Sequence, residues 1–247
     1  MKYLGLRFDP IDMDGACAIL RSRTGDDAYA YMVTPNVDHV VRLAELPTTA
    51  IEWNAYRQAD WCLCDSRVLS LFAAADGVPL PVVPGSDLTA HLFGSILSAG
   101  DRLCIIGGHA GDSARLIERW PGLDIVQYVP PMGLRHDAEA REQAARFAAT
   151  SGARFILLAV GSPQQELIAT AIGRQPDARG TALCIGASLD FLVGRERRAP
   201  RWMRRMALEW LHRLWVNPRR MWRRYLPAGP RMLRLRWRYR HGLRRRS

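Results

Sequence analysis

The sequence predicts an α/β protein with a mostly parallel sheet, helices on both faces of the sheet, and a basic, amphipathic, helical appendage at the C-terminus. Short runs rich in Val, Ile and Leu alternate with segments of helical periodicity, which is typical of a parallel sheet covered on both faces. Several of these runs end in turns of small residues, as in Rossmann-like folds. From residue 195 onward the composition becomes rich in Arg and Trp.

The expected strands are apolar runs of four to eight residues, a usual length for strands of a buried sheet. They cover residues 3–8, 29–34, 61–64, 80–83, 102–106, 124–128, 154–160 and 181–185. Helical patterns between them cover residues 48–59, 87–98, 112–120, 138–150 and 164–174. In such sheets, ligands bind at the carboxyl ends of the strands, so polar residues that follow the expected strands are candidates for a functional site.

The charge is distributed unevenly along the chain. The 247 residues carry a net charge of +11, and 48% of them are hydrophobic, enough for one sizeable core. Residues 195–247 contain 19 arginines, no lysine and two acids, for a net charge of +17, whereas residues 1–194 have a net charge of −6. We therefore expect an α/β catalytic domain over residues 1–194 and a separate appendage over residues 195–247.

The five cysteines predict reduced, buried thiols in a cytosolic protein, because their number is odd and their surroundings are apolar. Cys62 and Cys64 have no second Cys or His pair nearby, so we expect neither a metal site nor a cofactor. The start of the chain lacks the apolar core of a signal peptide, and no stretch approaches the roughly 18 apolar residues of a membrane span. Any membrane contact is therefore expected to be peripheral.

The appendage has helical periodicity. Apolar residues recur at helical spacing from Met203 to Trp215, and prolines at 218, 227 and 230 interrupt the two amphipathic stretches that follow. Five of the eight tryptophans lie in this region. Basic helices with Trp and Leu on the opposite face suit the headgroup zone of an anionic membrane.

Two other interpretations of the appendage stay open. The first helix can pack on the α/β domain or on a second subunit of a homo-oligomer, with residues 201–216 docked and residues 219–247 on lipid. Arg interleaved with aromatic residues also binds nucleic-acid phosphates. We favour the membrane surface and regard nucleic acid as the weakest of the three.

Residues 34–39 (TPNVDH) place Thr34, Asn36, Asp38 and His39 directly after an expected strand. A hydroxyl, an amide, a carboxylate and an imidazole at one strand end predict a functional loop. The structural alternative is a helix start, with Asn36 as the N-cap and Asp38 favourable to the helix dipole.

Asp65 follows the apolar run 61–64, at the carboxyl end of a buried strand. A carboxylate in this position suits a general base, because burial raises its pKa toward neutral pH. The structural alternative is that Asp65 caps the helix expected to begin near Ser66.

Residues 161–166 (GSPQQE) form a turn from a strand into a helix. With Ser162 as N-cap, Pro163 in the first helical position and Gln165 in the third, they match a capping box. The helix N-terminus that they open is also a site for an anion such as pyrophosphate.

Gly107 and Gly108 resemble a phosphate-binding loop, but neither G-x-G-x-x-G nor a Walker motif is present. A nucleophile elbow and H-E-x-x-H are absent too.

Together these segments resemble the WecG/TagA/CpsF family of bacterial glycosyltransferases (glycosyltransferase family 26). The matching segments follow the family order and span almost the whole chain. They are 34–36, Asp65, 84–88, 107–108, 131–133, 161–166, 186–194, 198–202, 208–214, 217–219 and 224–225.

The resemblance implies an inverting, metal-independent transfer from a UDP-sugar to a polyprenyl-diphosphate-linked saccharide in surface-polysaccharide synthesis. The enzyme would lie peripherally on the inner, cytoplasmic face of the cell membrane, with the basic appendage aiding attachment and completing the site. It implies Asp65 as base and Thr34, Asn36 and Gln165 as pocket residues. The other matched positions expected at the substrate are Gly85, Asp87, Gly107, Gly108, Gly161, Glu166 and Asp190.

The chain departs from the family pattern at three places. Ser66 stands where the family has Gly, Gln164 where it has Lys, and Pro81-Val82 where a Glu-Arg pair is common. The missing arginine is a candidate for binding diphosphate, and we expect Arg198 or Arg213 of the appendage to replace it. The alternative functions are a nucleic-acid-binding α/β protein and a nucleotide-dependent oxidoreductase, although no dinucleotide fingerprint supports the latter.

Overall fold

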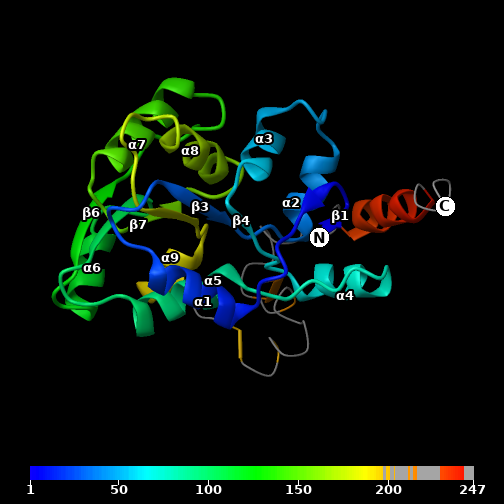
Figure 1. The fold of residues 1–247 in the computed structure, drawn as a ribbon, viewed down its shortest axis with the longest axis horizontal. Coiled ribbons are helices and arrows are strands. Elements are labelled where there is room, and N and C mark those ends of the chain that lie inside the picture. The colour runs from blue at the N-terminus through cyan, green and yellow to red at the C-terminus, as the bar shows by residue number, and fades with distance from the viewer. Residues whose placement is uncertain (197–198, 201–202, 204–210, 212–213, 216–228, 242–247) are drawn as a thin grey trace.

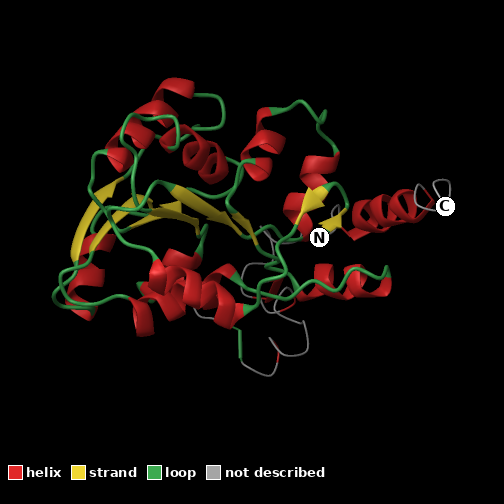
Figure 2. Ribbon diagram, in the orientation of Figure 1, coloured by secondary structure: helices red, strands yellow, loops and turns green. Residues whose placement is uncertain are grey.

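The computed structural model describes residues 1–196, 199–200, 203, 211, 214–215 and 229–241. Its centre is a six-stranded sheet in the order β4-β3-β8-β7-β5-β6 (Figure 2), in which every paired strand is parallel to its neighbour. The expected α/β class is thereby confirmed. The strands are β3 (Ala30–Val33), β4 (Trp61–Cys62), β5 (Arg102–Gly107), β6 (Asp124–Tyr128), β7 (Phe155–Ala159) and β8 (Thr181–Cys184).

Helices cover both faces of this sheet (Figure 1). One face carries α2 (Val37–Ala44), α3 (Ile51–Arg57), α7 (Ala138–Ala149) and α8 (Gln164–Ile172). The other face carries α1 (Met13–Ser22), α5 (Gly85–His91), the π-helical turn η1 (Leu92–Ile96), α6 (Asp112–Arg119) and α9 (Ser188–Leu192). Helix α4 (Arg67–Ala75) lies beyond the sheet, close to the C-terminal helix formed by residues 229–241.

The strands explain why the sheet needs two covering layers. In β7, Phe155 and Leu157 pack into one core layer while Ile156 and Leu158 pack into the other, and all four are fully buried. Successive side chains of a strand point to opposite faces, so a continuous apolar run requires apolar partners on both sides. The five cysteines are buried and unpaired, as expected.

Two expected strands take a different form. Residues 3–8 form a separate antiparallel hairpin of β1 (Lys2–Tyr3) and β2 (Leu6–Arg7), because Leu4 and Gly5 adopt positive φ angles that turn the chain back. Residues 80–83 contribute a single bridge between Cys64 and Val82. The prolines around this bridge lack the N–H that a longer ladder would need.

The end of the chain packs on the α/β body. Residues 229–241 form a helix whose Met232 is 1% exposed and joins the core layer that contains Tyr3. Arg236 of this helix bonds Asp76, and its guanidinium lies 5.0 Å from the centre of the Phe72 ring. The alternative interpretation placed intramolecular packing in residues 201–216 and lipid contact in residues 219–247, but the packing seen here lies in residues 229–241.

Most of the first appendage helix, predicted from Met203 to Trp215, lies outside the described residues. Within the ranges that the structure describes, no helix has the length and the apolar character needed to cross a bilayer.

Candidate active site

The predicted functional loops meet at one edge of the sheet because all six strands are parallel. Thr34 follows β3, Asp65 follows β4, Gly161 follows β7 and Gly186 follows β8, while Gly107 ends β5. Their carboxyl ends therefore face the same side, which is where ligands bind in open α/β sheets.

Asp65 is half-buried at this edge, and both of its carboxylate oxygens accept hydrogen bonds. Oδ1 accepts from the backbone N–H of Gly85 at 2.7 Å, and Oδ2 accepts from Nδ2 of Asn36 at 3.4 Å. The backbone N–H of Asp65 donates to the carbonyl of Pro35 at 3.1 Å. The carboxylate is thereby oriented from two neighbouring loops.

The structure excludes a capping role for Asp65. Ser66 is the N-cap of α4, with its Oγ accepting from the N–H of Leu69 at 3.2 Å. Asn36, by contrast, is the N-cap of α2, as its alternative interpretation predicted. Because Oδ1 of Asn36 accepts from the N–H groups of Asp38 and His39, its Nδ2 is left to donate toward Asp65.

Thr34 and Gly85 touch each other beside Asp65. A Cβ added to Gly85 would lie 2.8 Å from Oγ1 of Thr34, so a larger residue would push this hydroxyl away. Gly85 begins α5, and Asp87 lies in the first turn of the same helix. Thr34, Asn36, Asp65 and Gly85 therefore form one contiguous group.

The turn that opens α8 differs from the expected capping box. Pro163 is the N-cap of α8, and its side chain makes no capping hydrogen bond. The Ser162 hydroxyl instead accepts from Nη2 of Arg42 at 2.6 Å and lies 3.3 Å from the hydroxyl of Tyr56. The capping prediction for Ser162 was wrong because long-range partners from α2 and α3 compete for its side chain.

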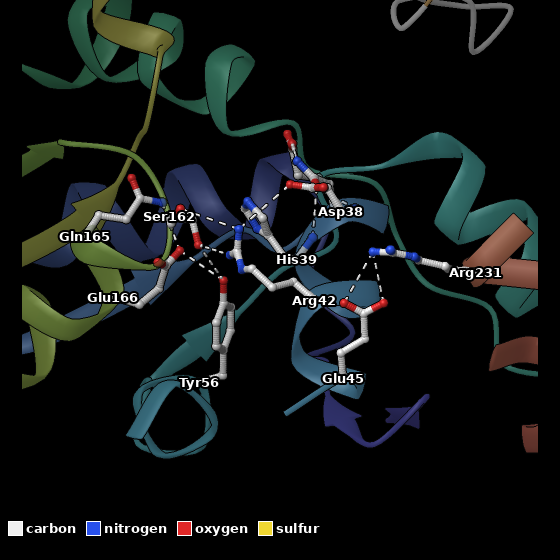
Figure 3. Close-up of polar contacts among 11 residues, drawn as sticks. Asp38, His39, Arg42, Glu45, Tyr56, Ser162, Gln165, Glu166 and Arg231 are labelled. Carbon is white, nitrogen blue, oxygen red and sulfur yellow. Dashed lines mark hydrogen bonds and ion pairs between the residues drawn. The ribbon is translucent and has the colours of Figure 1, made fainter. Parts of the chain in front are cut away.

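Gln165 and Glu166 form a second group (Figure 3). The Gln165 side chain connects two loops: its Oε1 accepts from the N–H of Gly186 at 2.9 Å, and its Nε2 donates to Oε1 of Glu166 at 2.9 Å. Glu166 is 1% exposed and also accepts from the Tyr56 hydroxyl at 3.0 Å. Because the Ser162 hydroxyl contacts both Tyr56 and Arg42, this group is connected to α2.

The loop after β5 forms a third group. Gly107 and Gly108 have φ angles of +100° and +73°, and a Cβ on either would lie 2.6 Å from a side-chain carbon of Val160 or Leu189, respectively. Gln127 of β6 holds the loop by donating to the carbonyls of Gly107 and His109. Glycine is thus required at both positions by backbone angle and by close packing.

A buried carboxylate lies next to this loop. Asp112, at the start of α6, is 1% exposed and accepts from the backbone N–H of His109 at 2.8 Å. Arg195 forms ion pairs with both Asp112 and Asp190. Desolvation of its guanidinium opposes the charged form, but these two carboxylates outweigh it and raise the pKa of Arg195. Asp190 is thereby engaged in a contact that holds the start of the appendage.

The predicted site residues therefore fall into three groups along one edge. Arg198 and Arg213 lie outside the described residues. Arg42, Tyr56, Asp112 and Arg195 were missed from the sequence because none of them belongs to a motif. For Arg42 the sequence held a weak signal, because Asp38 lies four residues before it, a spacing at which charged side chains of a helix can pair. In the structure their charged groups lie 3.8 Å apart on α2.

In the part of the chain that the structure describes, no three His, Cys, Asp or Glu side chains gather in a way that could hold a metal ion.

Comparison with protein families identifies the family of the chain. The model of the family described as "Glycosyl transferase WecG/TagA/CpsF family" matches residues 1–246, which is essentially the whole chain. The match covers every segment on which the sequence resemblance rested, so the expected family and the expectation of an enzyme are confirmed. The chain belongs to the WecG/TagA/CpsF family of glycosyltransferases, enzymes that transfer sugar in the synthesis of cell-surface polysaccharides.

Proposed function

We propose that this protein transfers a sugar from a UDP-sugar to a hydroxyl group of a polyprenyl-diphosphate-linked saccharide, with inversion at the anomeric carbon and without a metal ion. The observation that carries the proposal is the placement of Asp65. It is a half-buried carboxylate at the carboxyl edge of the sheet, oriented by Gly85 and Asn36 and not used as a helix cap.

In the proposed reaction, Asp65 accepts the proton of the acceptor hydroxyl as its oxygen attacks the anomeric carbon. The new C–O bond forms while the bond from that carbon to the diphosphate breaks, and the electron pair leaves with the nucleoside diphosphate. A carboxylate oxygen has two lone pairs, so one that accepts a hydrogen bond from Gly85 or Asn36 can also accept a proton. Orienting a base in this way contributes to general-base catalysis.

The charge of the leaving diphosphate needs positive partners. The N-terminus of α8 is one candidate, because its N-cap residue, Pro163, makes no side-chain hydrogen bond to the N–H groups there. Arg42 is another, since its guanidinium contacts both the carbonyl and the hydroxyl of Ser162 in the turn that opens α8. We further propose that Arg198 or Arg213 of the appendage adds positive charge to this site.

We also propose that the appendage holds the enzyme on the inner face of the cell membrane. The helix 229–241 packs its Met232 side inward and leaves Leu233 and Trp237 57% and 59% exposed. These residues are four apart and share one helix face, with the exposed Arg234 and Arg238 following each of them in sequence. An outward face with Leu, Trp and Arg suits an anionic membrane surface.

The test is a transfer assay with the full-length chain. UDP-glucose, UDP-N-acetylmannosamine and UDP-N-acetylmannosaminuronate are each offered with a short-chain polyprenyl-diphosphate monosaccharide, with and without EDTA, and products are identified by mass spectrometry. We expect a product one sugar heavier from one of these donors, at the same rate in EDTA. Loss of activity in EDTA would contradict the metal-independent mechanism, and no product from any donor would contradict the substrate assignment.

A further inference from the structure

Glu166 is a buried carboxylate whose position calls for an explanation. Its side chain is 1% exposed, and Oε1 accepts from both the Tyr56 hydroxyl and Nε2 of Gln165. No cation of the described residues forms an ion pair with this carboxylate, and burying a carboxylate without such a partner is costly. A purely structural role is therefore a poor explanation for Glu166.

Tyr56 holds Glu166 from the side of α3. Burial, and then the neighbouring Glu166 carboxylate, raise the pKa of Tyr56 well above its usual value, so its hydroxyl stays protonated and donates. The same hydroxyl lies 3.3 Å from Oγ of Ser162, which Arg42 contacts in turn. Figure 3 shows these side chains converging from separate elements on the Glu166 carboxylate and the adjacent turn.

The orientation of the Gln165 amide follows from its two partners. The Gly186 N–H can only donate, and the Glu166 carboxylate can only accept while it is ionised. Rotating the amide by half a turn would direct its oxygen at the carboxylate and its NH₂ group at another donor, making both contacts repulsive. The amide is therefore held in one orientation, and Nε2 retains a second N–H for another acceptor.

We propose that Glu166 is a positioning residue that locks the Gln165 amide so that it presents an N–H donor, and not its carbonyl, to an oxygen atom of a substrate. This inference rests on the proposed function, which places Gln165 at the substrate pocket. The substrate oxygen belongs either to the nucleotide sugar or to the acceptor saccharide. Separate KM measurements for the two substrates identify which one it is.

The first measurement needs no substrate. In protein labelled with ¹⁵N-glutamine, the two Nε2 proton resonances of Gln165 should lie farther apart than those of a solvent-exposed glutamine amide, because one of the protons is bonded to a carboxylate. A Glu166→Gln variant keeps an acceptor oxygen and should largely preserve this separation. A Glu166→Leu variant removes the acceptor and should reduce the separation toward that of a solvent-exposed glutamine amide. Equal Gln165 spectra in the wild type and Glu166→Leu would overturn the inference, whatever the enzyme transfers.

The second measurement is a double-mutant cycle on KM. Glu166→Leu should raise KM for one of the two substrates about tenfold, the size expected for losing a hydrogen bond, whereas Glu166→Gln should stay within about threefold. If Glu166 acts through Gln165, adding Glu166→Leu to Gln165→Ala should change that KM by less than about twofold. Independent, multiplying effects would overturn the positioning role, as would an unchanged KM in Glu166→Leu.

A matched control separates positioning from loss of a buried contact. Tyr29→Phe removes a tyrosine hydroxyl that donates to the carbonyl of Ala169 on the same helix, 2.8 Å away, without touching Gln165. We expect its KM values to match the wild type, and melting temperatures should identify any variant that is merely unfolded. Failure of the wild type to transfer any sugar would refute the proposed function, while the amide spectra would still decide whether Glu166 orients Gln165.

Discussion

Arg236 and Asp76 form a two-point ion pair across 160 positions of the chain. Nε and Nη2 of Arg236 each lie 2.8 Å from a carboxylate oxygen of Asp76. Asp76 is 1% exposed and also accepts from the Tyr3 hydroxyl at 2.8 Å. This bidentate pair connects the C-terminal helix to the end of α4, the helix that begins just after Asp65.

This ion pair predicts how firmly the C-terminal helix is docked. Asp76→Asn should speed hydrogen exchange of the amides in residues 229–241 at pH 7, because docking loses roughly 2 kcal/mol when the charged hydrogen bonds weaken. Glu45→Gln is the matched control, since Glu45 pairs with Arg231 of the same helix while both side chains are about half exposed. Exposed pairs contribute little, so exchange in Glu45→Gln should stay close to the wild type.

The same pair predicts a pH dependence. Hydrogen bonds from Arg236 hold the pKa of Asp76 below its usual value. A lowered pKa means that the stabilisation is fully present above the unfolded pKa of about 3.9 and is lost as the pH falls through the folded value. The difference between wild type and Asp76→Asn should therefore persist from pH 7 to about pH 5 and shrink below about pH 4. A difference that grows in acid would contradict the assignment.

Asp65→Asn tests the proposed base. The amide oxygen can still accept the Gly85 N–H, so the fold should be preserved, whereas kcat should fall by about 10²- to 10⁴-fold because no carboxylate receives the proton. Asp60→Asn is the control at the opposite end of the same strand, where Asp60 accepts from the N–H of Tyr31. Steady-state kinetics of both variants should show near-normal turnover for Asp60→Asn alone. Near-normal turnover in Asp65→Asn would remove Asp65 as the base.

Replacing Leu233 and Trp237 together with Ser tests the membrane contact. Both side chains point away from the body, so the variant should fold normally but cosediment less with vesicles of anionic lipid. Ile117→Ser provides a control, because Ile117 is 40% exposed on α6, at the far end of the molecule from the C-terminal helix (Figure 1). Equal sedimentation of wild type and double variant would show that this face does not bind lipid.

Gly108→Ala should destabilise the protein more than Gly111→Ala. Both glycines have positive φ angles, which cost an alanine about 1 kcal/mol. A Cβ on Gly108 would also lie 2.6 Å from Cδ2 of Leu189, whereas a Cβ on Gly111 meets nothing within 4 Å. The extra overlap should cost roughly 1 to 3 kcal/mol more, measured by denaturant unfolding. Equal losses would mean that α9 shifts to make room.

The sequence by itself determined the α/β class and most of the elements, because a continuous apolar run in a parallel sheet is a local signal. The strand expected over residues 124–128 coincides with β6. The helix expected over residues 138–150 is one residue longer than the observed α7, which ends at Ala149. The order of the matching segments along the chain also identified the family. The local pattern also predicted the start of α2 correctly, since Asn36 caps this helix and Asp38 lies in its first turn.

Tertiary structure decided which polar side chains cap helices and which take partners from distant parts of the chain. Ser66 caps α4 while Asp65 bonds Gly85 and Asn36, and Ser162 bonds Arg42 where a capping role was expected. Buried carboxylates such as Asp76 and Asp112 require partners, and these come from Arg236 and Arg195, which are distant in the chain. Side-chain spacing cannot reveal such pairs, because a buried charge is stabilised by whichever donor the fold brings within hydrogen-bond distance.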